Sequence, residues 1–143
     1  MDLNLSGKHA LVCGASEGIG RAAAIELAVL GANVTVLARR ESALQAVVDA
    51  LPNDSTQRHG LLVADIAATD ALGESVAELT ATRPVHILIN NTGGPPGGSA
   101  HGAEIAAYLD AFQKHLVANQ TLLQAVLPGW DLPVMTIYAL YPS

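Results

Sequence analysis

HALVCGASEGIG, residues 9–20, carries the clearest indication of a fold in this chain. HALVC is a short apolar run that ends at a glycine, which is typical of a buried β-strand. The residues that follow, GIGRAAAIELAVL at 18–30, are rich in alanine and leucine and stop at Gly31, which predicts a helix. A glycine-rich turn in this position places unpaired N–H groups at a helix N-terminus, where they suit a pyrophosphate. The alternative is a glycine-rich turn that binds no ligand.

The same alternation of short apolar runs and longer amphipathic stretches continues along the chain. Further strands are expected at 33–38, 60–65, 85–90 and 134–140, and further helices at 41–51, 69–82 and 103–127. Apolar strands separated by helices indicate a parallel sheet that is covered on both faces. The predicted fold class is therefore α/β, a doubly wound parallel sheet (Rossmann fold) with strand order 3-2-1-4-5. We expect a single domain over residues 1–143, truncated after about five strands, with an atypical tail at 129–143.

Composition excludes several classes of protein and of site. Half of the 143 residues are hydrophobic and the net charge is −6, which disfavours disorder, nucleic-acid binding and binding to an anionic membrane. The single cysteine, Cys13, excludes an internal disulfide, and no two of the five histidines have helical zinc-site spacing. We therefore expect no bound metal and interpret the histidines as structural residues. The first residues, MDLNLSGK, lack a signal-like apolar stretch, so a cytoplasmic protein is expected.

The glycine spacing is G-x-x-x-G-x-G, and at this point the chain resembles the short-chain dehydrogenase/reductase family. The family motif begins with threonine, where this chain has Cys13. The resemblance extends from Leu5 to Pro128 and is greatest to the 3-oxoacyl-carrier-protein reductase-like group. Further matches stand at the ends of the expected strands and of the long helix: Arg39-Arg40, Asp65-Ile66, Asn90-Asn91-Thr92-Gly93 and Leu127-Pro128.

The fold and the resemblance together imply a nicotinamide dinucleotide cofactor. In a doubly wound fold the end of the second strand meets the adenosine ribose, and guanidinium groups there favour NADP(H) over NAD(H). Glu17 opposes this preference, because a carboxylate repels a phosphate. Expected cofactor contacts are Gly14, Ala15, Ser16, Glu17, Gly18, Ile19, Gly20, Arg39, Arg40, Asp65, Ile66, Asn91 and Gly93.

Three of these assignments have an alternative in which the residue has a structural role and binds no ligand. The two arginines, Arg39 and Arg40, are alternatively solvated residues at the start of a helix. The Asp65 carboxylate is alternatively the cap of the turn that follows it. Asn91 alternatively only ties the fourth strand to its neighbours.

The catalytic residues of the family find no match here. The resemblance implies hydride transfer between the nicotinamide and a small-molecule carbonyl or alcohol, with a tyrosine acid tuned by a lysine in Tyr-x-x-x-Lys. This chain has no such motif, since its only lysines are Lys8 and Lys114. His115 occupies the position of the family's helix asparagine, with Asn119 one turn later, and Ser143 matches the serine only if the preceding turn is counted differently. The catalytic residues therefore stay unassigned.

We interpret the chain as the cofactor-binding half of an NADP(H)-dependent oxidoreductase, a truncated or frame-shifted product that acts on a carbonyl substrate only if completed. The alternatives are a non-catalytic NADP(H)-binding or regulatory module and an inactive fragment. In relatives the long helix helps to form a dimer interface, which implies a homo-oligomer. Its apolar residues are Ile105, Leu109, Phe112, Leu116, Leu122, Leu123 and Val126.

Overall fold

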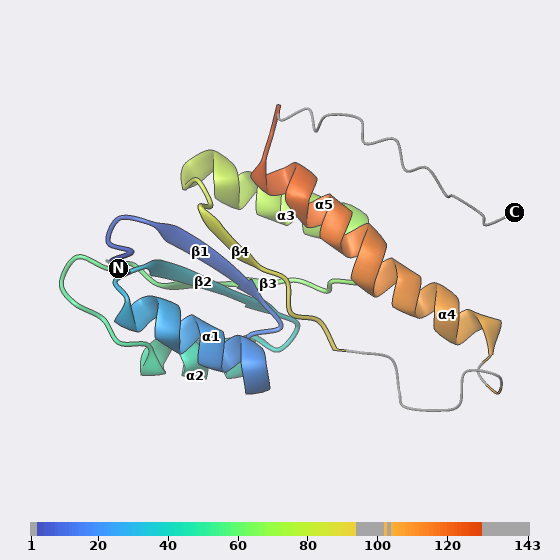
Figure 1. The fold of residues 1–143 in the computed structure, drawn as a ribbon, viewed down its shortest axis with the longest axis horizontal. Coiled ribbons are helices and arrows are strands. Elements are labelled where there is room, and N and C mark those ends of the chain that lie inside the picture. Colours follow the sequence, from blue (N-terminus) through green and yellow to red (C-terminus); the bar gives the residue numbers. More distant parts are fainter. Residues whose placement is uncertain (1–2, 94–101, 103, 130–143) are drawn as a thin grey trace, which may run out of the picture.

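The computed structural model describes residues 3–93, 102 and 104–129. Within these residues four parallel strands form one sheet in the order β3-β2-β1-β4 (Figure 1). The strands are β1 (His9–Cys13), β2 (Asn33–Ala38), β3 (Gly60–Val63) and β4 (Ile87–Ile89). The α/β class and the order 3-2-1-4 are thus confirmed, whereas the strand expected at 134–140 lies outside the described residues.

Helices cover both faces of this sheet (Figure 1). They are α1 (Gly18–Val29), α2 (Glu41–Ala50), α3 (Thr69–Thr82), α4 (Ile105–Phe112) and α5 (Ala118–Val126). Figure 1 shows α1 and α2 on one face, with α3 and α5 side by side on the other. Among the described helices none has the length and apolar character needed to cross a membrane.

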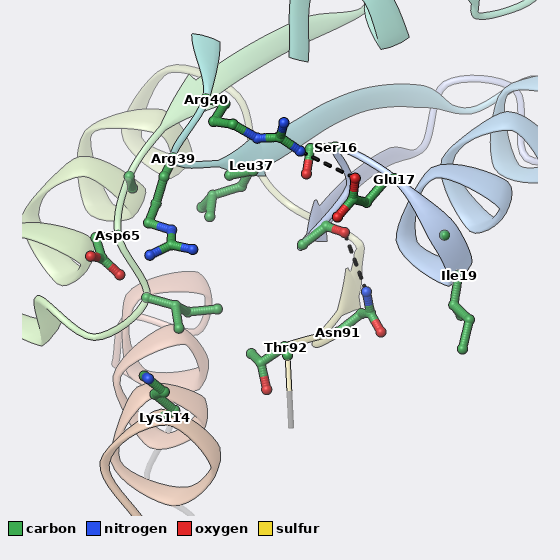
Figure 2. Close-up of a pocket in the computed structure, with 16 residues that line it drawn as sticks. Ser16, Glu17, Ile19, Leu37, Arg39, Arg40, Asp65, Asn91, Thr92 and Lys114 are labelled. Atoms are coloured by element: carbon green, nitrogen blue, oxygen red, sulfur yellow. Dashed lines mark hydrogen bonds and ion pairs between the residues drawn. The ribbon is translucent and has the colours of Figure 1, made fainter. Parts of the chain in front are cut away.

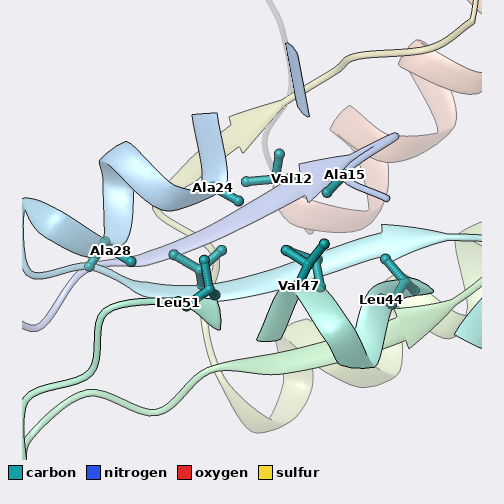
Figure 3. Close-up of a cluster of buried hydrophobic side chains, with 10 residues drawn as sticks. Val12, Ala15, Ala24, Ala28, Leu44, Val47 and Leu51 are labelled. Carbon is teal, nitrogen blue, oxygen red and sulfur yellow. The ribbon is translucent and has the colours of Figure 1, made fainter. Parts of the chain in front are cut away.

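Each face of the sheet has its own buried core, because successive strand residues point to opposite faces. On the face toward α1 and α2, Val12 and Val36 pack with small alanines of α1 and with Leu44 and Val47 of α2 (Figure 3). On the other face Leu11 packs with residues of α3 and α5. Since both faces are covered, most strand residues are apolar, with His9, Asn33 and Thr35 as polar exceptions, and this is the pattern that made the sheet predictable.

Two strands are shorter than the sequence predicts. β3 ends at Val63 rather than at 65, and β4 covers 87–89 rather than 85–90. Before β4 one main-chain bond to β1 remains, in which the His86 N–H donates to the His9 carbonyl oxygen at 2.8 Å, while a side chain takes the other position of the ladder. The backbone N–H of His9 donates to Nδ1 of the His86 ring at 3.1 Å, so His86 precedes the strand instead of lying within it.

The long helix predicted at 103–127 is divided in the structure. A π-helical turn, Gln113–Val117, joins α4 to α5, and residue 103 lies outside the described part of the chain. The turn contains no proline or glycine that would indicate it in the sequence. Beyond it Leu122 is fully buried and Val126 packs against the core, so these two residues are wrong as members of an exposed face. Ile105 and Phe112 are exposed as expected.

Candidate functional site

A cavity of about 880 Å³ lies at the carboxyl edge of the sheet, where the strands end (Figure 2). Its volume falls within the range of ligand pockets, roughly 300–1,000 Å³. Apart from Ala15 and Gly20, all of the residues expected to contact a cofactor line it. The complete lining is Gly14, Ser16, Glu17, Gly18, Ile19, Leu37, Ala38, Arg39, Arg40, Ala64, Asp65, Ile66, Asn91, Thr92, Gly93 and Lys114.

The glycine loop holds its shape through two close backbone approaches. A Cβ on Gly14 would overlap the carbonyl oxygen of Asn91, and one on Gly20 would overlap the carbonyl oxygen of Gly14. The Asn91 amide also donates to the Gly14 carbonyl at 3.3 Å, which ties the end of β4 to the loop. Ala15 is fully buried in the core beneath the loop. Ala15 and Gly20 therefore support the loop from behind and do not face the cavity.

The free surface of the loop faces the cavity at the N-terminus of α1. Gly18 adopts a φ of 58°, in the left-handed region that favours glycine, and a Cβ there would meet open space. Glu17 is the N-cap residue of α1, and it makes no side-chain cap hydrogen bond. The first N–H groups of α1 therefore lack a side-chain partner. Unpaired N–H groups at a helix N-terminus favour a bound anion.

The two arginines at the end of β2 have different environments. Arg40 forms an ion pair with Glu17, with 3.2 Å between Nη2 and Oε2, and both side chains are exposed. Arg39 points into the cavity (Figure 2) and has no hydrogen bond or ion pair within the described residues. Arg39 is therefore available to an anionic ligand, whereas Arg40 already pairs with a carboxylate.

Asp65 has one carboxylate oxygen occupied. Its Oδ1 accepts from the backbone N–H of Ala67 at 3.0 Å, so this residue does cap the turn after β3. It is also exposed and lines the cavity with Ile66. The turn-capping alternative therefore holds, and the second oxygen, which has no hydrogen bond within the described residues, can accept one from a ligand.

Thr92 and Lys114 line the cavity although the sequence did not place them there. Thr92 stands between two expected residues, so its position in the chain was a usable signal. Lys114 comes from the π-helical turn, which the sequence did not predict, and its Nζ pairs with Asp110 at 2.7 Å. The positive lining of the cavity thus includes a side chain from the long helix.

The residues considered for catalysis are not gathered in this cavity. His115 does not line it, and its Nδ1 lies 2.8 Å from the Thr92 hydroxyl oxygen. Ser143 lies outside the described residues. Asn119 Oδ1 is buried and has no hydrogen-bond partner in the part of the chain that the structure describes.

Metal ligands are not clustered in the described ranges. No group of three or more His, Cys, Asp or Glu residues there is arranged to hold a metal ion. Cys13 is fully buried at the end of β1, and burial raises the pKa of its thiol to about 12. The thiol is therefore neutral at ordinary pH and is a poor metal ligand or nucleophile.

Known proteins resemble the chain in both sequence and structure. A family model described as short chain dehydrogenase matches residues 8–133. The inactive hydroxysteroid dehydrogenase-like protein 1 of Pongo abelii is 30% identical over 125 residues, covering 86% of this chain and 38% of that protein.

Two solved structures share the arrangement of the sheet and helices. L-sorbose reductase from Gluconobacter frateurii, complexed with NADPH and L-sorbose, superposes with a TM-score of 0.81 at 26% identity, covering 90% of this chain and 49% of that chain. The 3-oxoacyl (acyl-carrier-protein) reductase of Agrobacterium tumefaciens C58, with NADP bound, has a TM-score of 0.80 at 26% identity, covering 89% and 49%. The chain thus spans between 38% and 49% of the length of these proteins.

Proposed function

The chain belongs to the short-chain dehydrogenase family, and we propose that residues 1–143 form the NADP(H)-binding domain of an oxidoreductase. The observation that carries this proposal is the cavity at the carboxyl edge. There the start of α1, the glycine loop and the unpaired Arg39 all face the same space. The reaction we assign is hydride transfer between the nicotinamide and a small-molecule carbonyl or alcohol.

The residues around the cavity fit a dinucleotide. We assign the pyrophosphate to the N-terminus of α1, because its N–H groups are free of side-chain caps and Gly18 leaves open space. We assign the adenine to Asp65 and Ile66, and the second ribose to Asn91 and Gly93. In a doubly wound sheet a ligand lies across the carboxyl ends of the strands, which is where these residues stand.

Preference for NADP(H) over NAD(H) rests on charge. Arg39 offers an unpaired guanidinium to a 2′-phosphate, and such pairs are charge-assisted and directional. Glu17 works against this preference, yet its carboxylate is paired with Arg40. The structural neighbours solved with NADPH and with NADP support the same preference.

The chemistry divides between the cofactor and the protein. When bound, the dinucleotide supplies or accepts the hydride, while these residues hold and orient it. A proton donor matched to neutral pH is also needed, and residues 1–143 contain no Tyr-x-x-x-Lys to provide one. We propose that residues outside this segment, or another chain, supply that acid. We further propose a 3-oxoacyl substrate class, supported by the likeness to the Agrobacterium reductase.

A second candidate is a non-catalytic NADP(H)-binding module. The observation in its favour is the missing Tyr-x-x-x-Lys, together with the similarity to a hydroxysteroid dehydrogenase-like protein that is named inactive. Turnover of a carbonyl substrate with NADPH separates the two candidates, because only the oxidoreductase consumes the cofactor.

We also propose that the protein associates with itself through the long helix. Ile105 is 77% exposed, and Leu109, Phe112 and Leu116 are more than half exposed. Large apolar side chains that gather on one exposed helix favour association.

Isothermal titration of the purified chain with NADPH and with NADH tests the cofactor assignment. We expect NADPH to bind more tightly, and Arg39→Gln to remove the difference by weakening NADPH alone. Lys8→Gln is the matched control, because Lys8 is exposed, directly precedes β1 at the opposite edge of the sheet and does not line the cavity. Absence of saturable binding by either cofactor would overturn the proposal.

A further inference from the structure

Three of the five histidines stand at the starts of strands, on the amino edge of the sheet and opposite the cavity. His9 is the first residue of β1, His59 directly precedes β3, and His86 directly precedes β4. The proposed function uses none of them. Because the sheet is parallel, the starts of its strands lie at one edge, and residues far apart in the sequence are brought together there.

His59 and His86 each accept a hydrogen bond from the main chain. The N–H of Val34 donates to Nδ1 of His59 at 3.2 Å, and the N–H of His9 donates to Nδ1 of His86 at 3.1 Å. A backbone N–H only donates, so both Nδ1 atoms must be without a proton. His59 uses its other nitrogen as well, since Nε2 lies 2.9 Å from the Pro52 carbonyl oxygen and donates to it. These bonds require neutral rings.

His9 is 1% exposed and is bonded on both sides of its ring. Its Nδ1 donates toward the carbonyl oxygens of Arg83 and Pro84, at 3.3 and 3.2 Å. Its Nε2 lies 2.9 Å from the hydroxyl oxygen of Thr35, which also accepts from Arg83 Nη2 at 3.1 Å. The Thr35 hydroxyl hydrogen therefore has Nε2 of His9 as its acceptor, and this ring too is satisfied as a neutral imidazole.

Positive charge disfavours an added proton on His9. Arg83 lies against His9, donates to the Arg58 carbonyl oxygen, and has its own pKa lowered by burial and by the Arg58 charge. Burial first, and then the charge of Arg83, lower the pKa of His9, and His86 adds a smaller effect in the same direction. His59 has a different environment, because the Asp54 carboxylate interacts with it and favours a proton on its ring.

We propose that His9, His59 and His86 form an acid-sensitive latch at the amino edge of the sheet, in which each ring holds its own hydrogen bonds only while it is neutral. A proton added at Nδ1 of His59 or His86 puts an N–H against the N–H that the ring had accepted, so that bond is lost. In mild acid the His9 and Val34 N–H groups lose these side-chain acceptors, while main-chain bonds such as that from the His86 N–H to the His9 carbonyl oxygen, at 2.8 Å, and the two apolar cores hold the sheet together. We call this group the amino-edge latch.

Native-state amide exchange followed by NMR tests the amino-edge latch on the full chain. Between about pH 7.5 and about pH 5.5, the range in which histidine titrates, the His9 and Val34 amides should lose protection. After correction for intrinsic exchange rates, the loss is at most about tenfold per pH unit for each proton taken up. Amides of Val12 and Val36, further along the same strands, should keep their protection. Unchanged protection of the His9 and Val34 amides would overturn the proposal.

A non-titrating substitution separates the amino-edge latch from a general loss of stability in acid. The Oδ1 of asparagine accepts the same N–H as Nδ1 of histidine but takes up no proton in this range. His86→Asn should therefore keep the His9 amide protected at the lower pH, whereas His115→Asn, at the cavity end, should leave the acid response as it is in the wild type. The Val34 amide of this variant should still respond, because it is bonded to His59. If the His9 amide of His86→Asn responds to acid as it does in the wild type, the proposal is wrong.

Ring nitrogen chemical shifts of the wild-type protein provide a test that needs no variant. At about pH 7.5, where an ordinary histidine is mostly neutral, His9 should carry its proton on Nδ1 and His59 on Nε2. The opposite tautomers, or charged rings, would equally overturn the proposal.

Discussion

Polar side chains at the two edges of the sheet differ in burial and in their hydrogen-bond partners. At the amino edge His9 and Thr35 are buried, and each finds partners in other strands or in Arg83. At the carboxyl edge Arg39 has no partner among the described residues, and the Glu17–Arg40 pair is exposed to solvent. Polar groups that satisfy one another stabilise the fold, whereas groups left without partners are free to hold a ligand. The same strands thus carry a structural end and a binding end.

The largest expected effect on stability concerns the backbone of the glycine loop at the carboxyl edge. Gly14→Ala should lower the free energy of unfolding by about 3 kcal/mol, because a left-handed φ of 60° and an overlap with the Asn91 carbonyl both oppose a side chain. Gly18→Ala has the same kind of φ but open space, so about 1 kcal/mol is expected. Urea unfolding measures both, and equal losses would show that overlap is not the cause.

The next prediction tests whether stability resides at the amino edge. Thr35→Val should cost about 2 kcal/mol, because it removes the hydroxyl that accepts from Arg83 and donates to His9. Arg39→Gln, at the other edge, should leave the urea midpoint unchanged and weaken NADPH binding. The contrast between the edges fails if Arg39→Gln destabilises the fold as much as Thr35→Val does.

Sequence reasoning was most successful where the determinant is local. The glycine loop, the apolar strands and the strand order follow from patterns within a few residues, and the first four strands occur in the predicted order. The cavity lining was largely predictable too, since parallel strands bring Gly14, Arg39, Asp65 and Asn91 to one edge.

What the sequence could not predict depends on contacts between distant segments. Arg39 and Arg40 are neighbours with the same chemistry, and only the approach of Glu17 from another loop distinguishes them. The amino-edge latch joins His9 to His86 across 77 residues, and no spacing rule connects the two. The π-helical turn that carries Lys114 into the cavity contains no glycine or proline, so nothing local indicates it.

A third prediction uses the opposite pH responses of the two ends of β1. His9 has a lowered pKa in the folded state, so its stabilisation is complete above the unfolded value near 6.5 and is lost as the pH falls below it. Cys13 has a pKa raised to about 12, so its stabilisation is present below the unfolded-state pKa of 9.0 and is lost as the pH rises above it. The free energy of unfolding should fall by about 1 kcal/mol between about pH 9 and about pH 10.

Cys13→Ala is the control for the alkaline side. The variant should be less stable at neutral pH because it leaves a small cavity, but the fall that Cys13 causes above pH 9 should disappear. If the free energy of unfolding of the variant falls by the same amount above pH 9, groups other than Cys13 cause the fall.

The smallest expected effect on stability belongs to the exposed ion pair. Glu17→Gln should leave the urea midpoint unchanged, because exposed pairs contribute little. NADPH should bind several-fold more tightly, since Arg40 is released and a carboxylate is removed, while NADH binding changes little. Titration with both cofactors measures this. Weaker NADPH binding in the variant would mean that the Glu17–Arg40 pair supports the cofactor site instead of opposing it.

The order of strands in the sheet also means that β1 is synthesised well before one of its two neighbours, β4. β1 lies between β2 and β4, and His86, at the start of β4, follows His9 by 77 residues. At about 5–20 residues per second, a ribosome needs about 4–15 s to make that stretch. All five residues of β1 are buried in the finished fold, yet one side of the strand has no partner during this time. The nascent chain therefore presents an unpaired apolar strand for seconds, long enough for a chaperone or for aggregation to act on it.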